Sequence, residues 1–297
     1  MTLQTLTTLV SAAAVILLTA CGGEHTHADE STHGHGDKKS HTHADGTTHA
    51  HDDAQSKSAS TSQQPANSFV ADIEKRHQKA AFLSHDAIEF DIELFFGGSK
   101  RLDATVTLSS DSRYARIDKK DGSTIIVRDD MVYASPALKD DKSVRFAAYT
   151  WSYFFMLPYK LSDDGTKWSS YTSMAESESS MDAMKLSFES GTGDAPDDWY
   201  IVYADEKLHQ LTHAAYIVTA GASQEEAEED PHAIAYDEYS VVQGVPIAQK
   251  WTFWGWREGK GLTDALGNAN LSRIGFVADA SKTFDVPDDF IEVPAAK

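Results

Sequence analysis

The stretch Ile88-Glu89-Phe90-Asp91-Ile92-Glu93-Leu94-Phe95-Phe96 decides the fold of this chain, because apolar and acidic side chains alternate along it. Successive side chains of a strand point to opposite faces of a sheet, so this period of two predicts a strand with one buried face and one wet face. Gly97-Gly98 then turns the chain, and the alternation resumes over residues 102–108. These runs predict an antiparallel hairpin that packs on a core from one side.

Short runs of strand type continue to the end of the chain. They cover residues 114–117, 124–127, 131–134, 184–188, 199–203, 208–218, 233–242, 247–256 and 272–278. No regular alternation of strands with helices is visible, so a parallel sheet is not expected. The sequence therefore predicts a mainly β fold, in which a single antiparallel sheet is curled into an incomplete β-barrel.

Two segments break the strand pattern and predict helices. In residues 68–83, Phe69, Ile73 and Ala80 share a helical face and Ser68 is a suitable N-cap, which predicts a leading helix. His77 lies close to that face and is expected to be a packed structural histidine. Residues 144–157 are apolar without alternation and end before Pro158, which predicts a helical lid or plug on the sheet.

Aromatic side chains of the plug and of a late strand are candidates for the lining of a ligand cavity. Residues 251–256 carry aromatics at both parities of a strand, so both faces of that strand are expected to be covered. Two interpretations stay open, because the same aromatics could fill a solid core. The candidate cavity residues are Trp151, Phe154, Phe155, Trp251, Phe253 and Trp254.

The N-terminus carries a signal of export. An apolar run over residues 9–18 has the length of a signal-peptide core and is too short to span a bilayer. It leads into Leu18-Thr19-Ala20-Cys21, which resembles the lipobox of bacterial lipoproteins, and Cys21 is the only cysteine of the chain. The resemblance implies that residues 1–20 are removed and that Cys21 is lipidated. Acyl chains would then hold the protein at a membrane of the cell envelope, and Gly22 favours the outer membrane, facing the periplasm or the surface.

Residues 21–66 predict a disordered, His-rich tether, because nothing in the segment is apolar enough to bury. It holds four His-x-His pairs at a spacing of eight residues: His25 and His27, His33 and His35, His41 and His43, His49 and His51. Two such pairs together would offer four imidazole ligands, the usual number for Zn²⁺, and imidazole also suits Cu²⁺ and Ni²⁺. The tail is thus expected to bind divalent metal, although repeat drift in a simple tether is the alternative. No cofactor is required elsewhere.

Charge and motifs exclude several classes of function. The formal charge of −20 disfavours nucleic acid and anionic lipid surfaces as partners. The chain has no Gly-x-Ser-x-Gly, His-Glu-x-x-His, P-loop or Gly-x-Gly-x-x-Gly motif, so the sequence does not predict an enzyme. His209 and His213 would lie about 13 Å apart in a strand and cannot share a metal there.

The folded domain, predicted over residues 67–297, resembles the LolA/LolB-like half-barrels. The resemblance rests on the lipobox, the order of elements and two segments, Trp-Ser-Tyr-Phe-Phe-Met-Leu-Pro-Tyr-Lys-Leu (151–161) and Asp-Trp-Tyr-Ile-Val-Tyr-Ala-Asp (198–205). It implies a cavity for acyl chains or another apolar ligand beneath a helical lid. The leading hypothesis is a lipid-anchored envelope protein that binds an apolar ligand or a protein partner. The alternative is a metal-scavenging lipoprotein whose tail is the functional part.

Overall fold

A computed structural model of the protein describes residues 63–295 and contains thirteen strands in that range. Each strand lies at or near a run that the hydrophobic pattern predicts, apart from β6 and β13. The strands are β1 (Ala87–Phe96), β2 (Ser99–Ser109), β3 (Tyr114–Lys119), β4 (Thr124–Arg128), β5 (Met131–Ala134), β6 (Thr166–Ser170), β7 (Met181–Phe188), β8 (Tyr200–Asp205), β9 (Leu211–Tyr216), β10 (His232–Val242), β11 (Val245–Arg257), β12 (Gly261–Val277) and β13 (Ile291–Val293).

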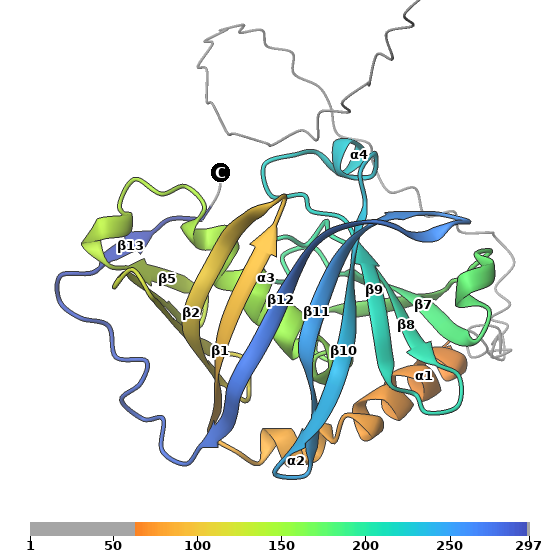
Figure 1. Cartoon of the computed structure of the whole chain (residues 1–297), viewed down its shortest axis with the longest axis horizontal. Coiled ribbons are helices and arrows are strands. Elements are labelled where there is room, and N and C mark those ends of the chain that lie inside the picture. The colour runs from red at the N-terminus through yellow and green to blue at the C-terminus, as the bar shows by residue number, and fades with distance from the viewer. Residues whose placement is uncertain (1–62, 296–297) are drawn as a thin grey trace, which may run out of the picture. The chain divides into compact units, whose positions relative to one another are not determined.

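All thirteen strands belong to one antiparallel sheet (Figure 1). Its order is β13-β5-β4-β3-β2-β1-β12-β11-β10-β9-β8-β7-β6, and the edge strands β13 and β6 do not pair with each other. The sheet is therefore open, which confirms the predicted class of a single antiparallel sheet curled into an incomplete barrel. The central pairing of β1 with β12 joins the first part of the chain to the last part.

One face of the sheet, which we call the inner face, is covered by the apolar helix near the middle of the chain. The helix α3 (Val144–Met156) lies behind β1, β12 and β11 in Figure 1 and continues as a 3-10 turn, Leu157–Tyr159. Its end before Pro158 confirms the prediction for this segment. The short helix α4 (Gln224–Ala227) lies in the acidic run of residues 224–230 and begins with a capping box formed by Ser223 and Glu226.

The leading helix differs from the prediction in its start and in its continuity. It consists of α1 (Gln63–Arg76) and α2 (Lys79–Leu83), so it begins five residues earlier than expected and is interrupted. Gln78 adopts a left-handed conformation with φ 56°, which ends α1 and redirects the chain. The new direction lets Phe82 stack on Tyr159, with ring centroids 3.9 Å apart. Tertiary packing therefore outweighs the helical periodicity of this segment.

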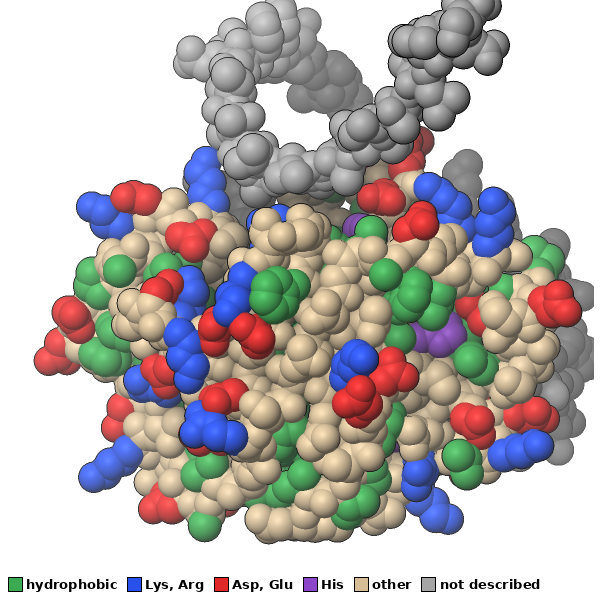
Figure 2. Space-filling model, viewed as in Figure 1, with side chains coloured by type: hydrophobic (Ala, Val, Ile, Leu, Met, Phe, Trp, Pro, Cys, Tyr) green, Lys and Arg blue, Asp and Glu red, His purple; other side chains and the backbone are tan. Residues whose placement is uncertain are grey.

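The alternation in β1 has the predicted consequence. Ile88, Phe90, Ile92 and Leu94 are buried at 0–2% exposure in the main core, whereas Glu89 and Glu93 are exposed. The opposite, outer face carries ion pairs such as Lys100 with Glu93 at 2.5 Å and Arg273 with Asp91 at 2.6 Å. Figure 2 shows charged side chains of both signs interspersed over this face. The inner face is thus apolar and the outer face is wet near the sheet centre.

The hydrophobic pattern does not predict three parts of the sheet. The strand β12 begins eleven residues before the predicted run, because its first part is rich in polar residues and glycine but pairs with β11 on one side and β1 on the other. The edge strands β6 and β13 are short and are defined by a single partner each, β7 and β5. Their hydrogen bonds come from residues distant in sequence, so local periodicity does not reveal them.

Candidate functional site

The predicted lipid-attachment and metal-binding residues lie outside the described part of the chain. These are Cys21 and the histidines of the tail, His25, His27, His33, His35, His41, His43, His49 and His51. Within residues 63–295, no group of three or more His, Cys, Asp or Glu side chains is placed to hold a metal ion. No helix of that range is both long and apolar enough to cross a bilayer.

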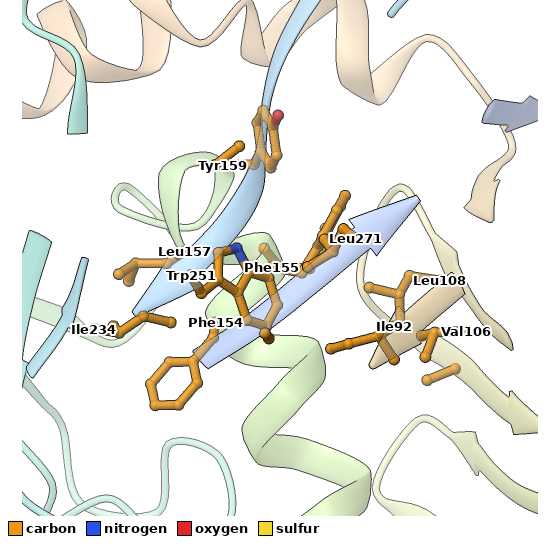
Figure 3. Close-up of a cluster of buried hydrophobic side chains, with 14 of the residues drawn as sticks. Ile92, Val106, Leu108, Phe154, Phe155, Leu157, Tyr159, Ile234, Trp251 and Leu271 are labelled. Atoms are coloured by element: carbon orange, nitrogen blue, oxygen red, sulfur yellow. The ribbon is translucent and has the colours of Figure 1, made fainter. Parts of the chain in front are cut away.

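Five of the six predicted cavity residues lie together on the inner face. Three come from α3: Phe154 and Phe155 are buried, and Trp151 is half-buried against the same core. Phe155 stacks on Phe90 of β1, with ring centroids 4.4 Å apart and an interplanar angle of 13°. Phe154 lies 4.9 Å from Tyr216 of β9. The helix therefore contacts strands from both halves of the open sheet, as Figure 3 shows for Phe154 and Phe155 among the core side chains.

The sheet contributes Trp251 and Phe253, which are 1% and 0% exposed on the inner side of β11. The ring centroid of Phe253 lies 6.0 Å from that of Trp151 and 6.1 Å from that of Phe154, so Phe253 packs directly against α3. Trp254 does not join this group. It packs on the outer face, in a second apolar cluster with Trp199 and Trp256. The prediction that β11 is covered on both faces is thereby confirmed.

Polar contacts hold α3 in register with the sheet. The hydroxyl of Tyr236 donates to the carbonyl of Phe154 at 2.9 Å in the buried core. Burial raises the pKa of this phenol well above its ordinary value, so it stays protonated and remains a donor. At the start of α3, the guanidinium of Arg145 forms an ion pair with Asp194 at 2.6 Å and donates to the carbonyl of Val293 at 3.3 Å. The helix is thus fastened at both ends of its length.

A small cavity lies between the C-terminal end of α3 and the sheet. The cavity there measures about 10 Å³ and is bordered by His77, Tyr159, Tyr239 and Trp251. That volume holds at most about one water molecule, whereas ligand sites of drug-sized molecules span roughly 300–1,000 Å³. In this arrangement the aromatic residues act as core. An apolar ligand could reach the inner face only if α3 moved aside.

A buried polar cluster lies on the outer face, beneath residues 171–180. Glu178 and His213 are each 3% exposed, and Glu178 Oε1 lies 3.4 Å from His213 Nε2. The hydroxyl of Ser173 donates to the other carboxylate oxygen, and the His213 ring stacks on Tyr203 with centroids 4.0 Å apart. Burial raises the pKa of Glu178, but the proximity of His213 and the hydrogen bond from Ser173 outweigh burial, so the pKa is lowered. The carboxylate therefore anchors residues 171–180 to the sheet.

A groove of about 490 Å³ opens beside this cluster. Its lining comes from α1, with Phe69 and Asp72, from the segment that carries Tyr171 and Glu178, and from the start of β7. The volume lies within the usual range for ligand sites, and the groove is far larger than the space beneath α3.

Sequence reasoning missed both the buried pair and the groove. His209 and His213 appear together in one predicted strand, but His209 precedes β9 in a left-handed turn, whereas His213 lies within β9. Glu178 sits in a polar stretch with no hydrophobic pattern. No local pattern of residues 171–184 points to either feature.

Comparisons with known proteins give likenesses of fold only. No family model and no curated protein matches the chain. Among solved structures, the chain is similar to a LolA superfamily protein from Nitrosomonas europaea, with 8% identity, 74% of this chain and 97% of that chain covered, and a TM-score of 0.48.

Two further solved structures are similar to the chain. A DUF1329 family protein from Desulfovibrio piger has 11% identity, covers 74% of this chain and 97% of its own, and gives a TM-score of 0.49. A putative outer membrane lipoprotein-sorting protein domain from Vibrio parahaemolyticus has 11% identity, coverage of 71% and 93%, and a TM-score of 0.45. At these values the likeness assigns no family, ligand or residue role to this chain.

Proposed function

We propose that the chain is a lipid-anchored, non-enzymatic binding protein of the bacterial cell envelope, which takes up an apolar ligand such as an acyl chain between α3 and the inner face of its sheet. The observation that carries this proposal is the makeup of that interface. An open sheet presents an apolar inner face, and one helix of 13 residues covers its centre with aromatic side chains. A ligand that displaces α3 would exchange one apolar cover for another, so the inner face of the sheet would stay shielded from water.

A brominated fatty acid tests this site, because bromine quenches tryptophan fluorescence only at short range. We expect saturable quenching in the purified protein, and the quenched fraction should fall in Trp151→Phe and Trp251→Phe. Trp199→Phe is the matched control, since Trp199 is buried in the cluster on the outer face. If quenching does not saturate, or if Trp199→Phe removes it, no ligand binds beneath α3.

A second variant tests the movement of α3. Arg145→Gln removes the ion pair with Asp194 and should speed ligand uptake, because the first turn of α3 is then held less firmly. Lys139→Gln, at an exposed residue outside α3, serves as the control for the change in charge. Equal uptake rates in the two variants would contradict the role of α3 as a lid.

The anchor belongs to the same proposal and rests on the sequence Leu18-Thr19-Ala20-Cys21. In cells, radiolabelled palmitate should be incorporated into the protein and lost in Cys21→Ala, and the variant should leave the membrane fraction. Thr26→Ala, which keeps the cysteine, is the control. Membrane attachment that survives Cys21→Ala would refute lipidation as the anchor.

The His-rich tail supports a second candidate function, in which the protein scavenges zinc or another divalent metal. The observation in its favour is the regular spacing of the four His-x-His pairs. Isothermal titration should detect Zn²⁺ binding that weakens as the pH falls through about 6.5, since protonated imidazole does not ligate metal. Deletion of residues 24–51 should abolish this binding and impair growth under zinc limitation or excess. Unchanged growth would leave the tail without a metal function in the cell.

A further inference from the structure

The sheet has an open edge beside the start of β7, and we call this side of the strand the outer edge of β7. The edge strand β6 pairs only with the later part of β7, from Met184 to Phe188. After Ser170 the chain leaves the sheet, and its next residues are fastened over the outer face through Glu178. As a result, Met181–Ala183 pair with β8 on one side but with no strand of the described chain on the other.

The backbone of Met181 points toward this open side. The N–H of Glu189, next to the end of β7, donates to Gly165 at 2.8 Å, and alternate residues of a strand direct their backbone groups to the same side. The carbonyl of Ser180 accepts a hydrogen bond from the N–H of Glu206. The even-numbered residues of β7 therefore direct their backbone groups toward β8, and the odd-numbered residues direct theirs away from it. Met181 thus offers a free N–H and C=O within the described chain, and such an edge is a template for an extended peptide.

The groove described above runs along this edge. It provides apolar contacts from Phe69 of α1 and from Met181 and Met184 of β7, next to hydroxyl and carboxyl groups. Figure 1 shows α1 and β7 on the same side of the molecule, and the two elements are in contact. A peptide strand in this position would direct its successive side chains to opposite faces of the sheet.

The charge of the groove selects the occupant. Asp72 is half-buried in α1 and Asp182 is exposed on β7, and neither carboxylate forms an ion pair with a residue of 63–295. Among residues 63–295, no Lys or Arg lines the groove. The chain's own residues 22–62 are a poor fit, because they carry seven acidic residues against three lysines. A basic segment from another protein is complementary in charge.

We propose that the outer edge of β7 binds an extended segment of a partner protein that carries basic and apolar side chains in alternation. The segment pairs with Met181 as an added strand and places its basic side chains near Asp72 and Asp182. This inference does not depend on an apolar ligand beneath α3, so either can fail without the other.

A fluorescein-labelled peptide of alternating Lys and Val tests the proposal by fluorescence polarisation with the full chain. We expect saturable binding that weakens with salt, and slower amide hydrogen exchange at the start of β7. The same peptide with alternate nitrogens methylated should not bind, since it cannot form the ladder of hydrogen bonds. A Glu and Val peptide should not bind either. Equal affinity for any of these control peptides would overturn the proposal.

Variants of the protein locate the site. The double variant Asp72→Asn and Asp182→Asn should bind the Lys and Val peptide about threefold to tenfold more weakly, the range expected for two solvent-accessible ion pairs. The control is Asp140→Asn with Asp164→Asn, which changes the net charge equally at exposed residues outside the groove. An equal loss in both double variants would overturn the proposal. So would binding that appears only after residues 24–51 are deleted, because the chain's own N-terminal segment would then be the occupant.

Discussion

His77 makes the stability of this fold depend on pH in a way that can be calculated. Its side chain is 1% exposed, and Nε2 accepts a hydrogen bond from the backbone N–H of Leu211 at 3.1 Å. The hydroxyl of Tyr239 donates to the carbonyl of the same residue at 2.9 Å. Burial, and next the positive charge of Arg76, lower the pKa of His77 from 6.5 to about 4. Protonation would also place a donor on Nε2 against the donor of Leu211.

The sign of the effect follows from the order of the two pKa values. Between pH 6.5 and about 4 the unfolded chain binds a proton that the folded protein excludes, so stability falls as the pH falls through this window. Below pH 4, the difference between the two pKa values lowers the free energy of unfolding by ~3.4 kcal/mol, at 1.36 kcal/mol for each pKa unit. At pH 5, His77 should already lower the free energy of unfolding by about 2 kcal/mol relative to its value at pH 8.

Urea denaturation followed by circular dichroism at pH 8, 6.5 and 5 measures this effect in the parent and in His77→Gln. The amide oxygen of glutamine can accept the bond from Leu211 but does not titrate in this range. The stability advantage of the parent at pH 8 should therefore shrink by about 2 kcal/mol at pH 5. Ile73→Val is the control, since it perturbs the same helix at a fully buried site without a titrating group. A parent-to-variant difference that stays constant with pH would refute the reasoning.

Three further outcomes follow from contacts in the core and on the sheet. Gly267→Ala should lower the thermal midpoint sharply, because a Cβ there would lie 2.2 Å from a backbone oxygen of β1. Gly275→Ala in the same strand is the control and should be close to neutral, because a Cβ there meets no atom within 4 Å. Phe253→Ala should cost about 3–5 kcal/mol in urea denaturation, since the side chain is fully buried against α3. Arg273→Gln should cost less than about 1 kcal/mol, because its guanidinium is exposed. The same variant should raise the pKa of Asp91, which hydrogen bonds from Arg273 lower to about 2, as an NMR titration would show.

The local pattern of the sequence determined the sheet centre and the covering helix. Ile88 to Leu94 alternate strictly, and only one register buries all of their apolar side chains. Gly97 and Gly98 adopt positive φ values of 60° and 74°, which glycine reaches without strain. The two glycines therefore predicted the turn from the sequence as well. Residues 144–156 lack alternation, are long for a strand and stop before a proline, which favours a helix. Each of these signals lies within a few residues of the structure that it specifies.

Tertiary structure alone decided the rest. The strand β12 is held by β11 and β1 through hydrogen bonds to residues distant in sequence, which no local pattern encodes. The break at Gln78 is set by the packing of Phe82, and the pairing of Glu178 with His213 joins two segments that carry no common motif. The open edge of β7 exists because β6 stops short of it. Side-chain periodicity reports which face of an element is buried, whereas strand partners and edges arise only when separate segments meet.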